Sequence, residues 1–166
     1  EPGDKVIVCI NGVFGMRMKE NITRFGGIAV VVEDAWGTAV STDKVEEALK
    51  ENSDAKVLAF VHAETSTGAR SDAKTLCKMA HDNDCVTIVD AVTSLVGSEL
   101  RVDEWGIDAI YSGTQKCLSA MPGISPVSFS ERALTKVKNR TIPVTSWFLD
   151  LNLVMGYWGE GAKRTY

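Results

Sequence analysis

Val86-Thr-Ile-Val-Asp90 and Ala109-Ile-Tyr-Ser-Gly-Thr-Gln-Lys116 are the two stretches that decide the fold. Each begins with an apolar run of strand length and ends in polar residues. If the two runs are neighbouring parallel strands, the Asp90 carboxylate and the Lys116 amine open onto the same edge of one sheet. A carboxylate and an amine at one sheet edge indicate a binding site there.

The rest of the chain repeats this alternation of apolar runs and amphipathic stretches. Strands are expected at 6–10, 28–32, 57–61, 86–89, 109–111 and 124–129. Helices are expected at 16–25, 43–52, after Ser71, at 130–139 and at 145–158. Strands that are apolar throughout and alternate with helices are typical of a mostly parallel sheet covered on both faces. We therefore expect an α/β three-layer sandwich forming a single domain over residues 1–166.

The helix boundaries have recognisable signals. Asp43, Ser71 and Ser130 are the expected N-caps, because their side chains can accept hydrogen bonds from free N–H groups of the first turn. The expected buried faces have helical spacing. They consist of Met18, Ile22 and Phe25; of Val45, Ala48 and Leu49; and of Ala73, Leu76, Cys77 and Ala80.

Composition excludes several classes of protein. The 166 residues are 45% hydrophobic and carry a net charge of -4, so no basic field favours nucleic acid or an anionic membrane. No apolar run approaches the roughly 20 residues that span a bilayer. The four cysteines form no C-x-x-C pattern and are expected to be reduced. Reduced thiols favour the cytoplasm, or the matrix of an organelle such as the peroxisome.

Polar residues gather where four of the expected strands end. In open α/β sheets, ligands bind beyond the carboxyl ends of the strands, so these clusters are the candidate site. They comprise residues 11–15, 62–68, 90–94 and 112–116.

Lys116 and Asp90 together match the needs of pyridoxal phosphate chemistry. A lysine amine forms a Schiff base with the cofactor aldehyde, and a carboxylate keeps the pyridine nitrogen protonated so that the ring accepts electrons. Each residue also has a simpler explanation. Lys116 could be an exposed lysine after a strand, and Asp90 could cap a helix.

The ordered clusters resemble the alanine–glyoxylate and serine–pyruvate aminotransferase family of class V pyridoxal-phosphate enzymes. The resemblance covers residues 1–166. It is strongest in Asn11-Gly-Val-Phe-Gly15, Glu64-Thr-Ser-Thr-Gly68, Val89-Asp-Ala-Val-Thr-Ser94 and Tyr111-Ser-Gly-Thr-Gln-Lys116. It implies the central part of the large domain of a fold-type I enzyme, truncated at both ends.

The resemblance also implies roles for individual residues. Lys116 matches the catalytic lysine, which binds the cofactor and moves the substrate proton. Asp90 matches the partner of the pyridine nitrogen, and Gln115 matches a residue that reaches the cofactor phosphate.

Four further positions match residues around the cofactor. Phe14 corresponds to the aromatic that stacks on the ring, and Val92 corresponds to the residue on the opposite face of the ring. Thr65 matches a hydroxyl residue near the ring's 3-hydroxyl group. Tyr166 matches a tyrosine that reaches the phosphate of the neighbouring subunit in a homodimer.

The implied reaction is transamination between a small amino acid (alanine or serine) and a small 2-oxo acid (glyoxylate or pyruvate). Two family features have no counterpart here, the N-terminal loop that cradles the phosphate and the C-terminal arginine that binds the substrate carboxylate. The chain is therefore expected to be a piece of a larger enzyme, inactive by itself.

Two alternative functions stay open at this stage. Another class V activity, such as a lyase or desulfurase, is disfavoured because Gln115 stands where desulfurases usually have histidine and because Cys117 is poorly placed. A folded unit without catalysis is the alternative from a different class. Cys77 and His81 have a spacing compatible with metal ligation, but two ligands do not make a zinc site.

Overall fold

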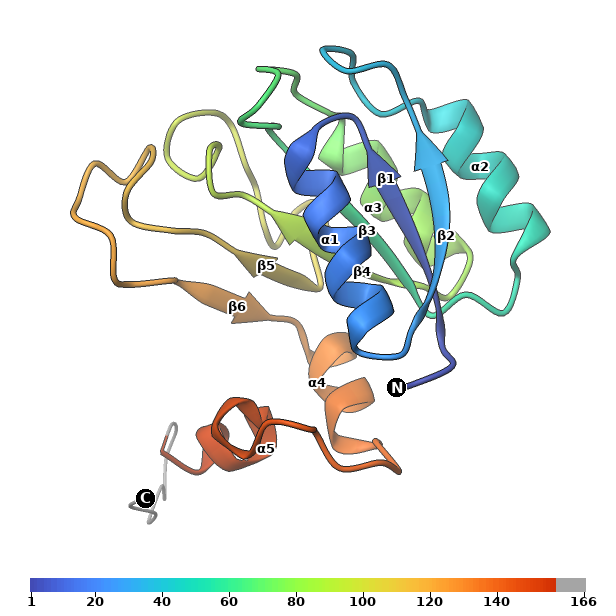
Figure 1. Ribbon diagram of the computed structural model, residues 1–166, viewed down its shortest axis with the longest axis vertical. Coiled ribbons are helices and arrows are strands. Elements are labelled where there is room, and N and C mark those ends of the chain that lie inside the picture. The colour runs from blue at the N-terminus through green and yellow to red at the C-terminus, as the bar shows by residue number, and fades with distance from the viewer. Residues whose placement is uncertain (158–166) are drawn as a thin grey trace.

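The computed structural model describes residues 1–157, which form one layered structure around a six-stranded sheet (Figure 1). The strand order across the sheet is β2-β1-β3-β4-β5-β6. The strands are β1 (Lys5–Ile10), β2 (Ile28–Glu33), β3 (Val57–Val61), β4 (Val86–Asp90), β5 (Ala109–Tyr111) and β6 (Val127–Phe129). All six strands expected from the sequence are therefore present.

The sheet is parallel except at one edge. Strands β1 to β5 pair in parallel, and β6 pairs with β5 in the antiparallel direction. In the β4–β5 pair, Asp90 lies opposite Tyr111, so both strands end at the same level of the sheet. This register confirms that the segments after β4 and β5 leave from one edge.

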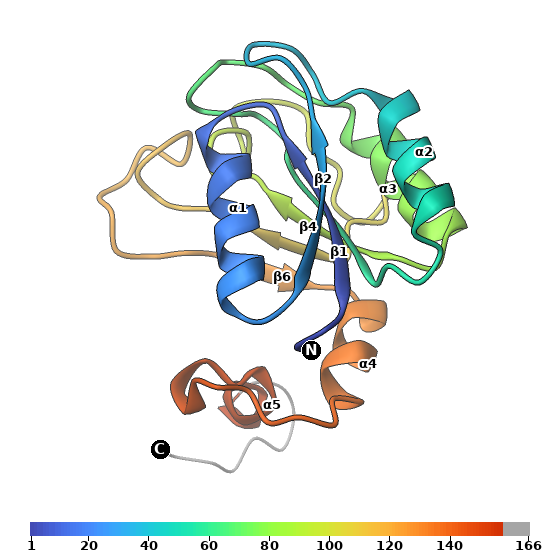
Figure 2. The ribbon, with the colours of Figure 1, turned by 45° about the vertical axis from the view of Figure 1, so that its right-hand side comes forward.

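Helices lie on both faces of the sheet (Figure 2). The helices on the two faces are α1 (Val13–Arg24), α2 (Thr42–Glu51) and α3 (Ala73–Asp82), whereas α4 (Glu131–Lys138) and α5 (Leu151–Val154) lie beyond the end of the sheet, at the bottom of the view. Helix α1 packs on one face through Met18, which joins Val8 and Ala59 in a buried cluster. Helices α2 and α3 pack on the other face, where Leu49 and Leu76 join a larger cluster. The three-layer expectation is confirmed.

The cover on the α1 side is uneven. A groove of about 450 Å³ lies beside α1 and is lined largely by apolar residues, among them Val6, Ile22, Ile88, Tyr111 and Ile142. Phe25, which the helical pattern placed on the buried face of α1, is the C-cap of that helix, lines this groove and is 66% exposed.

Several helix boundaries differ from the sequence-based predictions. Ser41 caps α2 in place of Asp43, and Asp72 caps α3 in place of Ser71, whereas Ser130 caps α4 as expected. Ser71 is instead buried, and its hydroxyl accepts a hydrogen bond from the N–H of Val40. The expected helix at 145–158 is broken into short turns at Trp147–Leu149, Leu151–Val154 and Met155–Tyr157.

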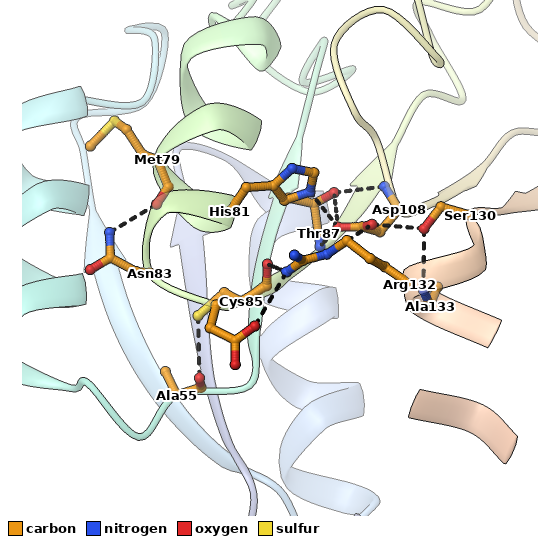
Figure 3. A network of polar contacts seen from close by, with 11 residues as sticks. Ala55, Met79, His81, Asn83, Cys85, Thr87, Asp108, Ser130, Arg132 and Ala133 are labelled. Atoms are coloured by element: carbon orange, nitrogen blue, oxygen red, sulfur yellow. Dashed lines mark hydrogen bonds and ion pairs between the residues drawn. The ribbon is translucent and has the colours of Figure 1, made fainter. Parts of the chain in front are cut away.

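One buried carboxylate joins four elements on the α3 side of the sheet (Figure 3). Asp108 is 1% exposed and lies at the entrance to β5. One of its oxygens, Oδ2, bonds the ring of His81 on α3 at 2.8 Å and accepts the N–H of Thr87 on β4 at 2.9 Å. The other oxygen accepts the hydroxyl of Ser130, the α4 cap, at 2.7 Å. Asp108 therefore ties α3, β4 and α4 to the start of β5.

Replacing Asp108 by alanine is expected to lower the free energy of unfolding by about 3 kcal/mol, because the buried N–H of Thr87 and the part-buried His81 ring and Ser130 hydroxyl lose their acceptor together. The measurement is urea unfolding of the chain followed by circular dichroism. Asp103→Ala removes an exposed carboxylate from the same connection and should change the unfolding free energy by less than about 0.5 kcal/mol. Equal effects of the two substitutions would contradict the role given to Asp108.

Candidate active site

The four polar clusters at the strand ends meet through side-chain hydrogen bonds. The first link joins the loop after β3 to the start of α1. Glu64 is fully buried, and its Oε2 accepts the N–H groups of Phe14 and Gly15 at 3.1 and 3.2 Å. Its Oε1 accepts the N–H and the hydroxyl of Ser66 at 3.1 and 2.7 Å. A remote carboxylate thus caps α1, whose own N-cap residue, Gly12, has no side chain for this purpose.

Gly12 lies so close to this carboxylate that a side chain has no room. A Cβ at Gly12 would lie 2.4 Å from Cγ of Glu64 and 2.6 Å from the hydroxyl of Ser66. At Gly15, a Cβ would lie 2.7 Å from the carbonyl oxygen of Cys9 on β1. The two glycines of the Asn11–Gly15 motif are therefore explained by close approach, the first to Glu64 and the second to the strand.

Further links connect the loop after β3 to the loops after β4 and β5. The hydroxyls of Thr65 and Thr93 form a short hydrogen bond. The thiol of Cys117 donates to the carbonyl of Thr93 at 3.0 Å, and the hydroxyl of Ser112 donates to the carbonyl of Ala91 at 3.1 Å. The turn that carries Lys116 is thereby attached to the segment that follows Asp90.

Asp90 is the buried acid of the site. It is 4% exposed; its Oδ1 accepts the N–H of Val92 at 2.9 Å, and its Oδ2 accepts the hydroxyl of Tyr111 at 2.7 Å. Burial raises the pKa of Asp90, and the nearby Glu64 carboxylate raises it further, while the two hydrogen bonds oppose the shift. Burial and Asp90 in turn raise the pKa of Tyr111, so this phenol remains a donor.

The Lys116 side chain is accessible to a ligand. It lies in an exposed turn after β5, and no side chain within residues 1–157 forms a hydrogen bond or ion pair with its ammonium group. Gln115 is also exposed. A Cβ added at Gly113 would lie 2.8 Å from Oε1 of Gln115, so the two residues are in close contact. Tyr166 lies outside the described residues.

Phe14 and Val92 lie at the same edge and are half-buried. Phe14 packs beside the α1-side cluster, and the Arg17 guanidinium lies 4.8 Å from the centre of its ring. One face of the ring is therefore covered by a cation, so a flat ligand has the other face to stack on.

Sequence reasoning missed three residues that build this site. Glu64 and Tyr111 lie within the family motifs, but the resemblance assigns no role to either. A signal existed for Glu64, because a buried carboxylate needs hydrogen-bond donors around it. Thr93, which contacts Thr65 and Cys117, gave no signal of its own because its partners are distant in sequence.

The donor set fits pyridoxal phosphate. A carboxylate oxygen has more than one acceptor site, so Asp90 can accept a pyridinium N–H besides its present bonds. The Lys116 amine and the Thr65 hydroxyl lie on segments that are joined at this edge, and Phe14 and Val92 add apolar side chains there, so these are the further groups that such a cofactor would contact.

Neither a metal site nor a membrane span is found in the described part of the chain. Residues 1–157 contain no group of three or more histidine, cysteine, aspartate or glutamate side chains arranged to hold a metal ion. His81, considered above with Cys77, instead bonds Asp108. No helix in this range is long and apolar enough to cross a membrane.

The fold and the strand-end clusters are those of a class V aminotransferase domain. The family model described as aminotransferase class-V matches residues 1–143. The chain belongs to this family. Its similarity to alanine–glyoxylate aminotransferase of Drosophila melanogaster is 36% identity over 100% of the chain. A (S)-ureidoglycine–glyoxylate transaminase of Bacillus subtilis is also 36% identical, over 96% of the chain.

Solved structures agree with this assignment. The alanine–glyoxylate aminotransferase of Nostoc sp. superposes with a TM-score of 0.94 and 37% identity over the whole chain, which covers 44% of that protein. A cysteine desulfurase of Thermococcus onnurineus, at 21% identity and a TM-score of 0.67, shares the fold. The chain spans 42% of the length of the fruit-fly and Bacillus relatives.

Replacing Glu64 by glutamine is expected to lower the free energy of unfolding by about 1–3 kcal/mol. The glutamine NH₂ group takes the place of one acceptor oxygen, so two of the present donors would face another donor. The measurement is urea unfolding. The control is Glu47→Gln, an exposed carboxylate on α2 without a partner in the described residues, which should cost less than about 0.5 kcal/mol. A Glu64→Gln variant as stable as this control would refute the capping role.

Replacing Asp90 by asparagine is expected to stabilise the cofactor-free chain at neutral pH. Because the folded-state pKa of Asp90 is raised, the ionised side chain costs stability above that pKa, and the cost disappears as the pH falls and the carboxyl takes up its proton. An asparagine oxygen keeps the bond from Val92, and its NH₂ group can donate to Tyr111.

Thermal unfolding across a pH series measures this effect. The advantage of Asp90→Asn should shrink towards acidic pH, whereas Asp103→Asn should show no such trend. A variant that is less stable than the parent at neutral pH would contradict the expected burial cost.

Proposed function

We propose that the protein containing this chain is a pyridoxal-phosphate-dependent aminotransferase, and that residues 1–166 are the central part of its cofactor-binding large domain. The observation that carries the proposal is the joining of the segments after β3, β4 and β5 around a buried Asp90 and a free Lys116.

Pyridoxal phosphate, when bound, supplies an aldehyde and an electron-accepting ring. Asp90 Oδ holds the proton on the pyridine nitrogen, and its burial strengthens that interaction. Phe14 and Val92 bind the two faces of the ring and exclude water. Thr65 orients the side bearing the 3-hydroxyl group. Gln115 and, from the neighbouring subunit of a homodimer, Tyr166 bind the phosphate.

Lys116 is the proton carrier of the proposed reaction. Its Nζ accepts the proton from Cα of the amino acid and returns it later in the cycle. A position on an exposed turn, without an ion-pair partner among residues 1–157, leaves Nζ able to move between these tasks.

The substrates we propose are a small amino acid, alanine or serine, and a small 2-oxo acid, glyoxylate or pyruvate. Two of the relatives carry glyoxylate in their names with different amino donors, which supports glyoxylate as the acceptor.

Desulfurase chemistry is the competing proposal, and the position of Cys117 disfavours it. Its thiol is half-buried and donates to the carbonyl of Thr93, which fixes the turn. A desulfurase needs a cysteine that moves to the substrate, and this one has a structural task.

The proposal is tested by adding pyridoxal phosphate, reducing with borohydride and locating the pyridoxyl group by peptide mass spectrometry. The label is expected on Lys116 and should be lost in Lys116→Arg, which keeps the charge but not the reactive amine. Lys19→Arg, at an exposed position on α1, should keep full labelling. Little or no turnover of alanine with glyoxylate is expected from the 166 residues alone.

Two outcomes would count against the proposal. A label spread over several lysines would show that Lys116 is not a selective site. The absence of any label would favour a folded unit without cofactor chemistry.

A further inference from the structure

A second pocket has a volume of about 370 Å³. It lies on the α3 face of the sheet, whereas α1 and Tyr111 lie on the other face. It is formed where β3 ends, at the N-terminus of α3 and against the connector before β5. Its lining residues are His62, Arg70, Ser71, Asp72, Ala73, Lys74, Glu99 and Trp105. The proposed aminotransferase reaction uses none of them.

The charged side chains of this pocket are unequally engaged. Both acids already have partners: Asp72 accepts the N–H and hydroxyl of Thr75 at 3.1 and 2.7 Å, and Glu99 pairs with Arg101 at 2.7 Å. The two bases, Arg70 and Lys74, form no side-chain hydrogen bond or ion pair within residues 1–157. The two cations are therefore available to a ligand, while the Asp72 carboxylate, bonded only to neutral groups of Thr75, keeps its negative charge beside them.

His62 provides a second, independent sign of a ligand site. It is 2% exposed, lines the pocket, and its Nδ1 is buried without a hydrogen-bond partner among the described residues. A buried polar atom without a partner is costly, and in the tautomer that carries the ring proton on Nδ1 a carboxylate oxygen would satisfy it. Burial, together with Arg70, lowers the pKa of His62, so the ring is neutral at physiological pH and carries one N–H donor.

Trp105 forms an aromatic wall of the pocket. Its ring meets the His62 ring edge to face, with centroids 6.0 Å apart and an angle of 77° between the planes. The half-buried indole offers an apolar surface beside the two free cations. A ligand that fits both features has an anionic head and a carbon body.

We propose that this pocket binds a small organic carboxylate. The planar guanidinium of Arg70 matches a carboxylate in a two-bond arrangement, Lys74 adds charge, and the carbon body lies against Trp105. A phosphate dianion fits less well, since Asp72 and Glu99 on the rim repel a second negative charge. The inference is independent of the proposed function, because no cofactor or active-site residue takes part.

The pocket is nevertheless next to the candidate active site through the backbone. The N–H of His62 donates to the carbonyl of Asp90 at 2.9 Å, and the carbonyl of His62 accepts the N–H of Ser71 at 2.9 Å. His62, which lines the pocket, is therefore joined by one backbone hydrogen bond to Asp90, the acid of the candidate active site.

The test is calorimetric titration of the 166-residue chain with acetate, benzoate and inorganic phosphate. Benzoate is expected to bind more tightly than acetate because of its contact with Trp105, and phosphate is expected to bind more weakly than benzoate. Arg70→Gln combined with Lys74→Gln should weaken benzoate binding about tenfold or more, since a hydrogen bond between charged groups is lost.

A matched double variant, Lys19→Gln with Lys138→Gln, removes the same charge from two exposed lysines elsewhere and should leave the affinity unchanged. NMR of the histidine rings gives a second readout that does not depend on a variant. The sequence contains two histidines, so the benzoate-induced shift should appear at His62 and not at His81.

Three results would overturn the proposal. They are an affinity reduced equally by both double variants, phosphate binding as tight as benzoate binding, and a His62 resonance that does not move as benzoate is added. None of these outcomes depends on labelling of Lys116, so this inference and the proposed function can fail separately.

Discussion

The buried carboxylate of Glu64 is the interaction on which the candidate active site depends. The parallel strands end in separate loops: those after β1 and β3 continue into α1 and α3, and those after β4 and β5 continue through turns to the next strand. Glu64 binds the first turn of α1 and its own loop at once, and so sets the distance between Phe14 and Thr65. A full charge without solvent is tolerable because four donors surround it. A helix N-terminus adds to this stabilisation, because its dipole favours a negative charge.

The same edge of the sheet contains a second buried acid, Asp90, which has fewer hydrogen-bond donors around it. Asp90 is nearly as buried as Glu64 but has two donors instead of four, and its pKa is raised. The protein thus satisfies one carboxylate fully and leaves the other with spare acceptor capacity. Such a pairing is typical of functional sites, where one group is rigid support and the other is kept ready for a ligand. Tyr111 maintains the position of Asp90 while that capacity is unused.

Apolar runs and strand-end clusters were sufficient to predict the strands, their mostly parallel arrangement and the segments that meet at the edge. Local signals failed where the partner is remote. The start of α1 could not be predicted at Val13, because its cap comes from Glu64, about fifty positions along the chain. Asp72 replaced Ser71 as a cap since the hydroxyl of Ser71 is used by Val40. The antiparallel direction of β6 is equally invisible in a three-residue strand.

Asp108 links positions that are scattered along the sequence, and this has an evolutionary consequence. Any one of its donors, His81, Thr87 or Ser130, can change while the carboxylate still has the others to satisfy it. Replacing Asp108 itself is different, because it removes the acceptor of all three donors at once. Related proteins should therefore vary at the donor positions one at a time, and a lineage that replaces residue 108 should carry compensating apolar substitutions at several of them together.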